Sequence, residues 1–209
     1  MSCNSSRCLE VIIKKRIKEF ERLEKRGETT FDFRPFLNLK IRATVETELA
    51  FCISTANSSA LAGLRFQKAL EDIDLNSLSV DKIAKLMAEA GVRFAKRKAE
   101  YLKMAIERFD IVESALKLDD FHARKLLLKI KGLGMKESSH FLRNVGRKDL
   151  AILDRHILRW LKAKGYDFKL PKDYIKAEDV LRFFASSRGM SLAEFDLLIW
   201  FNMTGKVLK

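Results

Sequence analysis

Residues 126–161, LLLKIKGLGMKESSHFLRNVGRKDLAILDRHILRWL, decide the fold. A Gly-x-Gly turn at 132–134 interrupts a helix predicted over 120–130, and a second helix is predicted from about Met135 to near Gly146. Two helices joined by so short a turn form a hairpin. Glycines allow the backbone to turn tightly and to approach a ligand closely. The amides that begin the second helix then point outward, where they can bind an anion such as a phosphate.

Three positions of this turn are candidate contacts to a phosphate backbone: Lys131, Gly132 and Gly134. A basic side chain attracts the anion, and two positions without a side chain leave the backbone amides accessible. The alternative is that the glycines only allow a tight turn between two helices.

Lys136 lies in the first turn of the second predicted helix, where the helix dipole disfavours a cation. The same field, together with any burial, favours the neutral amine. A neutral lysine amine is a nucleophile that can attack carbon and form a Schiff base. The alternative is a solvated lysine that contacts a phosphate.

The length of the intervening chain allows Asp154 to lie near Lys136. The helix over 136–145 carries the chain away by roughly 15 Å, at about 1.5 Å per residue. The return over 146–153 spans at most roughly 26 Å when it is extended. Asp154 also precedes a helix predicted over 155–164, so it is an N-cap with a fixed orientation. A purely structural cap is the alternative, and the two roles are compatible.

The rest of the chain has helical periodicity nearly throughout. With two prolines and nine glycines in 209 residues, long helices are favoured and no convincing pair of strands is found. The predicted fold is all-α, with two helical lobes and the hairpin at their cleft. The further helices are predicted over 7–26, 42–56, 60–72, 80–90, 94–108, 111–117 and 192–203.

The chain is predicted to form one unit over 1–209. The central lobe covers about 30–165 and contains the hairpin, 120–146. The helices of 1–30 and 170–209 are expected to pack together as the other lobe.

The formal net charge of +13 predicts a polyanionic partner, most simply nucleic acid. A solvated basic surface is the alternative. No apolar run is long enough to span a bilayer and no leader sequence is found, so an intracellular protein is expected. The three cysteines lack CxxC spacing and the three histidines lack a metal-ligand arrangement, so no metal is predicted. His122, His140 and His156 are interpreted as packing or helix-surface residues, with a cleft position as the alternative for His156.

The run Gly132–Lys136, followed by Leu153–His156, resembles the helix-hairpin-helix, Gly-Pro-Asp superfamily of DNA glycosylases. The resemblance implies that Lys136 is the catalytic nucleophile and Asp154 the essential acidic residue. The wider strings 136–146, 152–158 and 200–209 resemble the archaeal and thermophile type of 8-oxoguanine DNA glycosylase/lyase.

This type of enzyme implies excision of 8-oxoguanine from double-stranded DNA in base excision repair, through a Schiff base and β-elimination. It implies no cofactor, a monomer, and a cytoplasmic, nucleoid-associated location. The superfamily members that hold an iron–sulfur cluster carry four cysteines after the catalytic region. No cysteine follows Cys52 here, so a cluster is excluded.

The resemblance also implies a base pocket. Phe94 and Trp200 stack on the extruded base, and the terminal carboxylate of Lys209 contributes to its recognition. Asp196, one turn before Trp200, is a further polar contact. On the residues alone, ordinary core packing is the favoured explanation of both aromatic side chains, and only the resemblance makes the pocket role equally well supported.

Asn57 and Ser58, in a turn between two predicted helices, are candidates for filling the gap that an extruded nucleotide leaves in the duplex. Two other functions remain open. One is a glycosylase for a different damaged base. The other is a non-catalytic hairpin module, which would use the glycines but has no need of Lys136 with Asp154. A structural protein is supported only by helicity and charge.

Overall fold

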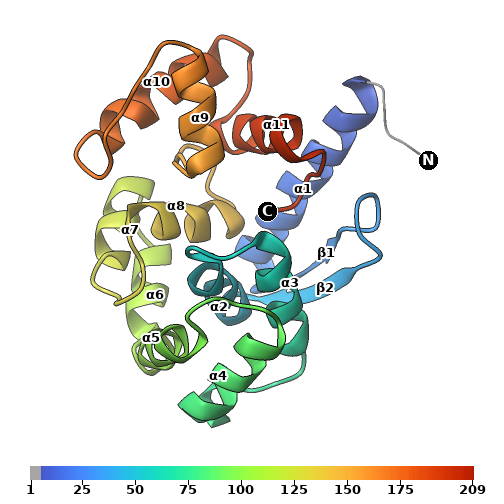
Figure 1. Ribbon diagram of the computed structural model, residues 1–209, viewed down its shortest axis with the longest axis vertical. Helices are drawn as coiled ribbons and strands as arrows, with labels where there is room; N and C mark the ends of the chain where they lie inside the picture. Colours follow the sequence, from blue (N-terminus) through green and yellow to red (C-terminus); the bar gives the residue numbers. More distant parts are fainter. Residues whose placement is uncertain (1–5) are drawn as a thin grey trace.

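The computed structural model describes residues 6–209, and helices form nearly all of its regular structure (Figure 1). The predicted all-α fold is confirmed in its main feature. The helices are α1 (Ser6–Arg26), α2 (Val45–Thr55), α3 (Ala60–Ala69), α4 (Val80–Glu89), α5 (Ala95–Glu107), α6 (Phe109–Leu116), α7 (Asp120–Leu127), α8 (Met135–Asn144), α9 (Arg155–Ala163), α10 (Tyr174–Ser186) and α11 (Leu192–Thr204), with a 3-10 turn at Leu75–Ser77. None of the helices within 6–209 is both long and apolar enough to cross a membrane.

A two-stranded antiparallel sheet corrects the expectation that no strands pair. Strand β1 (Glu28–Asp32) pairs with β2 (Lys40–Thr44), with Glu28 opposite Thr44. Alternate residues of each strand are buried, as a half-buried strand requires. The strands have five residues each and no tight-turn dipeptide joins them, so their alternation is a weak signal.

The same sheet corrects the helix predicted over 42–56. Its first three residues belong to β2, and the helix α2 begins at Val45. Thr44 and Thr47 form a capping box at this point, with each side chain accepting a hydrogen bond from the other residue's backbone amide.

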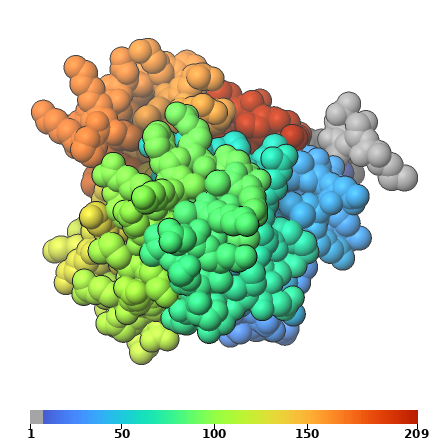
Figure 2. Space-filling model, turned by 60° about the horizontal axis from the view of Figure 1, so that its bottom comes forward, coloured from blue at the N-terminus to red at the C-terminus, as the bar shows by residue number. Residues whose placement is uncertain are grey.

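Two hydrophobic cores lie on either side of α11. The larger core is built from α1–α8 and the sheet, with Leu197 of α11 and Leu208 beyond it. The smaller core contains α9, α10 and the opposite face of α11, including Phe195 and Ile199. In Figure 2 the orange surface of α9 and α10 lies beside the green and cyan surface of the helices around α4 and α5. The helix α1 packs against both α8 and α11.

The predicted hairpin is formed by α7 and α8. Gly132 has a φ of +99°, which only glycine adopts without strain, and a Cβ at this position would lie 2.9 Å from Cδ2 of Tyr101. Gly134 is the N-cap of α8 and supplies no side-chain cap, so the amides of the first turn of α8 have no capping side chain at this residue.

A buried carboxylate fixes the segment that returns to this hairpin. Glu178 of α10 accepts two hydrogen bonds from Arg124 of α7, at 2.6 and 3.0 Å. It also accepts the backbone N–H of Ala151, at 2.8 Å, while the Tyr174 hydroxyl donates to the Ala151 carbonyl at 2.8 Å. These bonds hold residues 150–153 beside α7, and thereby position Asp154.

The two hairpin glycines differ in how much stability a substitution by alanine would remove. We expect Gly132→Ala to lower the free energy of unfolding by about 1–3 kcal/mol, because of its positive φ and the contact with Tyr101. Gly134→Ala should cost less than about 1 kcal/mol, since its only close neighbour is the flexible end of Glu137 at 3.1 Å. Chemical denaturation measures both values, and equal losses would contradict this account of the turn.

Candidate active site

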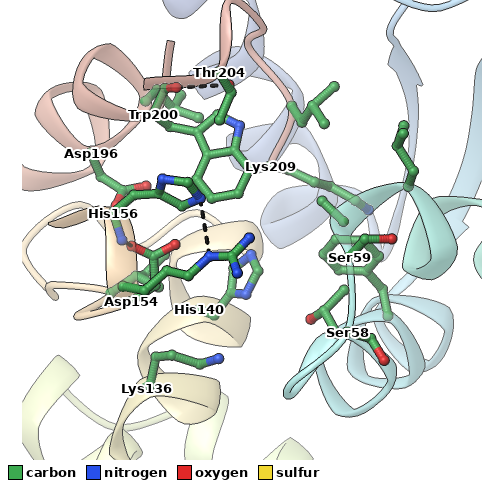
Figure 3. Close-up of a pocket in the computed structure, with 18 of the residues that line it drawn as sticks. Ser58, Ser59, Lys136, His140, Asp154, His156, Asp196, Trp200, Thr204 and Lys209 are labelled. Carbon is green, nitrogen blue, oxygen red and sulfur yellow. Dashed lines mark hydrogen bonds between the residues drawn. The ribbon is translucent and has the colours of Figure 1, made fainter. Parts of the chain in front are cut away.

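A cavity of about 790 Å³ opens between the two cores (Figure 3). One wall is formed by α8, by residues 152–156 and by α11, and the opposite wall by the α2–α3 turn and the start of α3. Its rim is basic, because Arg93, Arg155 and Lys206 line it together with Lys136. A cavity of this size can hold a nucleotide, and its charge suits an anionic ligand.

Lys136 lines the cavity from the first turn of α8. Its side chain is 29% exposed, and its Nζ lies 3.0 Å from Oε1 of Glu137. The amine is thus accessible from the cavity, and its ion pair is with the next residue of the same helix.

Asp154 caps α9, as its position before a helical segment predicts. One carboxylate oxygen accepts the backbone N–H groups of His156 and Ile157, at 2.8 and 2.9 Å. The second oxygen is left for other contacts. Asp154 lines the same cavity as Lys136, and Figure 3 shows the two side chains on one wall. The structure therefore brings these two predicted residues together although 17 residues separate them.

Trp200 and Asp196 line the cavity one turn apart on α11. The Trp200 ring packs edge-on against His156, with ring centroids 4.9 Å apart. Asp196 accepts a hydrogen bond from Arg143 at 2.9 Å. Burial raises the pKa of Asp196 to about 7; Arg143 opposes this shift and Asp154 adds to it.

The side chain of Lys209 is fully buried, while the residue still lines the cavity. Its Nζ donates to the Glu48 carboxylate and to the Gln67 side chain. Glu48 also accepts from Asn144 at 2.6 Å. Burial lowers the pKa of Lys209 to about 8, although Glu48 opposes the shift. This cluster fixes the last residue of the sequence against the cavity wall.

The sequence did not predict the roles of Glu48, Gln67 and Asn144. The available signal was the position of Glu48 among apolar residues of α2, since an acidic residue on a buried face needs partners.

Phe94 is not brought into the cavity wall. Its side chain is 62% exposed and its φ is +59°, a left-handed conformation that is uncommon outside glycine. The neighbouring Arg93 does line the cavity, and its guanidinium lies 5.3 Å from the centre of the Phe94 ring. Phe94 is therefore at the rim rather than against a bound base in this conformation.

Asn57 and Ser58 both line the cavity, and Figure 3 shows Ser58 across from Lys136. Asn57 has a φ of +53° in the tight turn between α2 and α3. At the hairpin, Lys131 is exposed and its Nζ lies 5.4 Å from the centre of the Tyr101 ring.

Two of the three histidines lie in the cavity wall. His156 follows Asp154 and His140 lies one helical turn after Lys136, whereas His122 is exposed beside Asp119. The spacing of four residues from Lys136 was the signal that would have placed His140 on the cavity face. Burial lowers the pKa of His140 well below its usual value, and Arg143 and Lys136 act in the same direction.

The sequence profile of the helix-hairpin-helix 8-oxoguanine DNA glycosylases matches residues 13–190. The chain belongs to this family. The match confirms the resemblance predicted from the hairpin and the residues that follow it.

Relatives in this family share the full length of the fold. The chain is 43% identical over 209 residues to an 8-oxoguanine DNA glycosylase/AP lyase of Aquifex aeolicus, covering 94% of this chain and 92% of the relative. The solved 8-oxoguanine DNA glycosylase of Thermotoga maritima superposes with a TM-score of 0.81 at 34% identity, covering 96% and 92%. The Methanocaldococcus jannaschii glycosylase/lyase, solved with a 15mer DNA containing 8-oxoguanine, gives 0.81 at 37%, covering 99% and 95%.

His140 should make stability depend on pH. Its pKa in the folded state lies below the ordinary value of 6.5, so the unfolded chain binds a proton first as the pH falls. Its contribution is present above pH 6.5 and is lost below it, by at most about 1.4 kcal/mol per pH unit. Asp196, whose pKa is raised to about 7, stabilises the folded state as the pH falls through the same window, so the test is the difference between two proteins. In urea unfolding between pH 7.5 and 5, the free energy of unfolding of the unaltered protein should fall relative to that of His140→Gln. The exposed His122→Gln serves as the control, and a loss unchanged in His140→Gln would contradict the assignment.

Proposed function

We propose that this family member is a bifunctional DNA glycosylase and lyase that excises 8-oxoguanine from double-stranded DNA in base excision repair. One observation carries the proposal. A lysine and an aspartate lie on the same wall of a cavity that can hold a nucleotide, in a chain whose relatives are named 8-oxoguanine DNA glycosylase/AP lyase. Base chemistry of this kind requires the nucleotide to leave the stack, because the glycosidic bond is inaccessible inside the duplex.

Binding of the duplex is assigned to the hairpin. The amides of the first turn of α8, with Gly132 and Gly134 leaving them accessible, donate to DNA phosphates. Lys131 and the formal net charge of +13 add attraction that does not depend on sequence. One cavity contains both reacting groups, so a monomer suffices.

Lys136 and Asp154 carry the chemistry. The neutral amine of Lys136 attacks C1′ of the deoxyribose, a C–N bond forms, and the bond from C1′ to the base breaks. The carboxylate of Asp154, held in place by its two backbone hydrogen bonds, stabilises the positive charge that develops on the sugar. The departing base takes up the proton that the amine loses. The C1′–O4′ bond then breaks, which opens the sugar and converts the new C1′–N bond into the Schiff base with Lys136. Loss of a C2′ proton finally expels the 3′ phosphate by β-elimination.

The base pocket is assigned to α11 and to the end of the sequence. Trp200 offers a ring face to the extruded base, and Phe94 closes over the other face after a movement from the rim. 8-Oxoguanine has an N–H at N7 where guanine has an acceptor, so a main-chain oxygen of Lys209 can tell the two apart. Asp196 supplies a further polar contact. Asn57 and Ser58, on the facing wall, fill the space left in the duplex.

Two other functions would use the same fold. A glycosylase for another oxidised base would retain Lys136 and Asp154, and differs only in the pocket. A hairpin module that only grips DNA would not need the lysine in the cavity, where its amine is accessible.

The lysine mechanism predicts a covalent adduct. Borohydride should trap the unaltered protein on a duplex with one 8-oxoguanine and not on an undamaged duplex, because reduction fixes the Schiff base. Lys136→Gln should abolish trapping and strand cleavage, whereas Lys129→Gln, which changes an exposed lysine in the turn after α7, should retain both. Asp154→Asn should slow excision by at least about a hundredfold. Trapping by Lys136→Gln would refute the assignment of the nucleophile. Trapping only on another lesion would show that this lesion, rather than 8-oxoguanine, is the substrate.

Stacking by Trp200 predicts a separation of the two activities. Trp200→Ala should slow excision of 8-oxoguanine about ten- to a hundredfold, since base–aromatic stacking contributes about 1–3 kcal/mol. Cleavage at a preformed abasic site, which has no base to stack, should change less than about threefold. Phe183→Ala, an exposed aromatic residue of α10, is the matched control. Equal losses in both activities would contradict a stacking role.

A further inference from the structure

Two turns from different parts of the sequence meet beside the cavity. One is the α2–α3 turn, which contains Asn57 and Ser58, and the other is the segment before α5, which contains Arg93. The hydroxyl oxygen of Ser58 accepts the backbone N–H of Arg93 at 2.8 Å. All three residues line the cavity, and Figure 3 shows Ser58 on the side opposite Asp154, so the α2–α3 turn faces the proposed reacting groups.

Lys98 lies behind this pair of turns and bonds to it. The residue is only 6% exposed, on the first part of α5. Its Nζ donates to the carbonyl of Ser54, at the end of α2, at 2.7 Å, and to Oγ of Ser58 at 3.0 Å. Ser58 is thus the shared acceptor for the Lys98 ammonium and the Arg93 amide. The end of α2, the α2–α3 turn and the start of α5 are joined through one side chain.

The partners of Lys98 are a carbonyl and a hydroxyl rather than a carboxylate. Burying an ammonium without an ion pair is unfavourable in free energy. If packing were the only need, a methionine of similar length would be more favourable at this position. Burial lowers the pKa of Lys98 to about 8, and the cations Lys136 and Arg93 act in the same direction. The group is still mostly protonated near pH 7 and can donate both bonds.

We propose that Lys98 is a positioning residue that joins the α2–α3 turn and the Arg93 segment into one rigid insert, which enters the duplex and keeps the damaged nucleotide in the cavity. The inference rests on the proposed function. It assigns to Lys98 no contact with DNA or with the reacting atoms. Its effect is to restrict the conformational freedom of the two turns before DNA binds, so that less conformational entropy is lost on binding.

Capping of α2 alone does not account for the arrangement. A cap requires a donor to the last carbonyl groups of the helix, which the Ser54 bond supplies. The second bond, to Ser58, connects the helix end to a turn that the cap does not need, and through Ser58 to Arg93. A capping role predicts lost stability alone, whereas the proposed role predicts a specific loss on duplex DNA.

The test compares two reactions of the intact protein. The first is single-turnover excision of 8-oxoguanine from a duplex, which requires the nucleotide to be extruded. The second is cleavage at a preformed abasic site in single-stranded DNA, which requires no extrusion and uses the same Lys136. Lys98→Met should slow the first reaction at least about tenfold and change the second less than about twofold. The reason is that the variant must order the two turns when it binds the duplex, which costs about 1–2 kcal/mol, and single-stranded DNA does not require this ordering. Lys98→Arg, which keeps a buried donor, should recover most of the loss.

Two further variants separate positioning from stability. Ser58→Ala removes the shared acceptor and leaves the bond to Ser54, so the chain should fold normally and still show the duplex-specific loss. The double variant with Lys98→Met should be no slower than the slower single variant, because both changes break one connection. Lys96→Met, an exposed lysine on the same helix, should behave as the unaltered protein.

Each outcome decides the matter. A duplex-specific loss that is recovered by arginine and is not additive with Ser58→Ala supports the insert. Equal losses in both reactions, or unchanged excision by a folded Lys98→Met, overturn it. If the unaltered protein excises no base and cleaves no abasic site, the proposed function fails and the inference fails with it, whereas an active unaltered protein leaves the proposed function untouched by any result at Lys98.

Discussion

The Glu178 carboxylate is the interaction on which the rest of the site depends. It receives both ends of the Arg124 guanidinium and the backbone N–H of Ala151, so one buried group of α10 holds the hairpin and the returning segment together. Removing one partner would leave a buried charge uncompensated, which costs about 3–5 kcal/mol. Because Lys136 begins the helix after the hairpin and Asp154 ends the returning segment, their common wall exists only while this carboxylate is bonded on both sides.

Charge is buried around the cavity at several other points, and each buried group fixes a different wall. Arg143 holds Asp196 on α11, and Glu48 holds the side chain of Lys209. Such groups are expensive to desolvate and contribute little net stability. They do give fixed orientations, which a cavity needs if it is to present polar atoms to a ligand without rearranging.

The hairpin, the position of Asp154 and most of the helices were predictable because each depends on local sequence. A Gly-x-Gly run between two periodic segments predicts a tight turn whether or not it binds a ligand, and an aspartate before an apolar periodic segment is a strong cap. The sheet was missed because its alternating strands are short. The bonds of Glu48 and Lys98 join residues far apart in the sequence, so no local pattern reports them. Phe94 differs from its expected place because its backbone conformation, set by the α4–α5 turn, directs the ring outward.

Three lysines lie near the cavity in different environments, and the difference supports the proposed choice of Lys136 as the nucleophile. Burial lowers the pKa of both Lys98 and Lys209 to about 8, so each loses its proton more easily than an ordinary lysine, although both are still mostly protonated near pH 7. Each is nevertheless enclosed, and each donates to two fixed oxygens that hold its nitrogen away from the cavity. Lys136 is the one of the three whose side chain is substantially accessible. Access to the cavity, rather than ease of deprotonation, therefore supports the proposed attack by Lys136, while the hydrogen bonds of the other two lysines hold parts of the cavity wall in place.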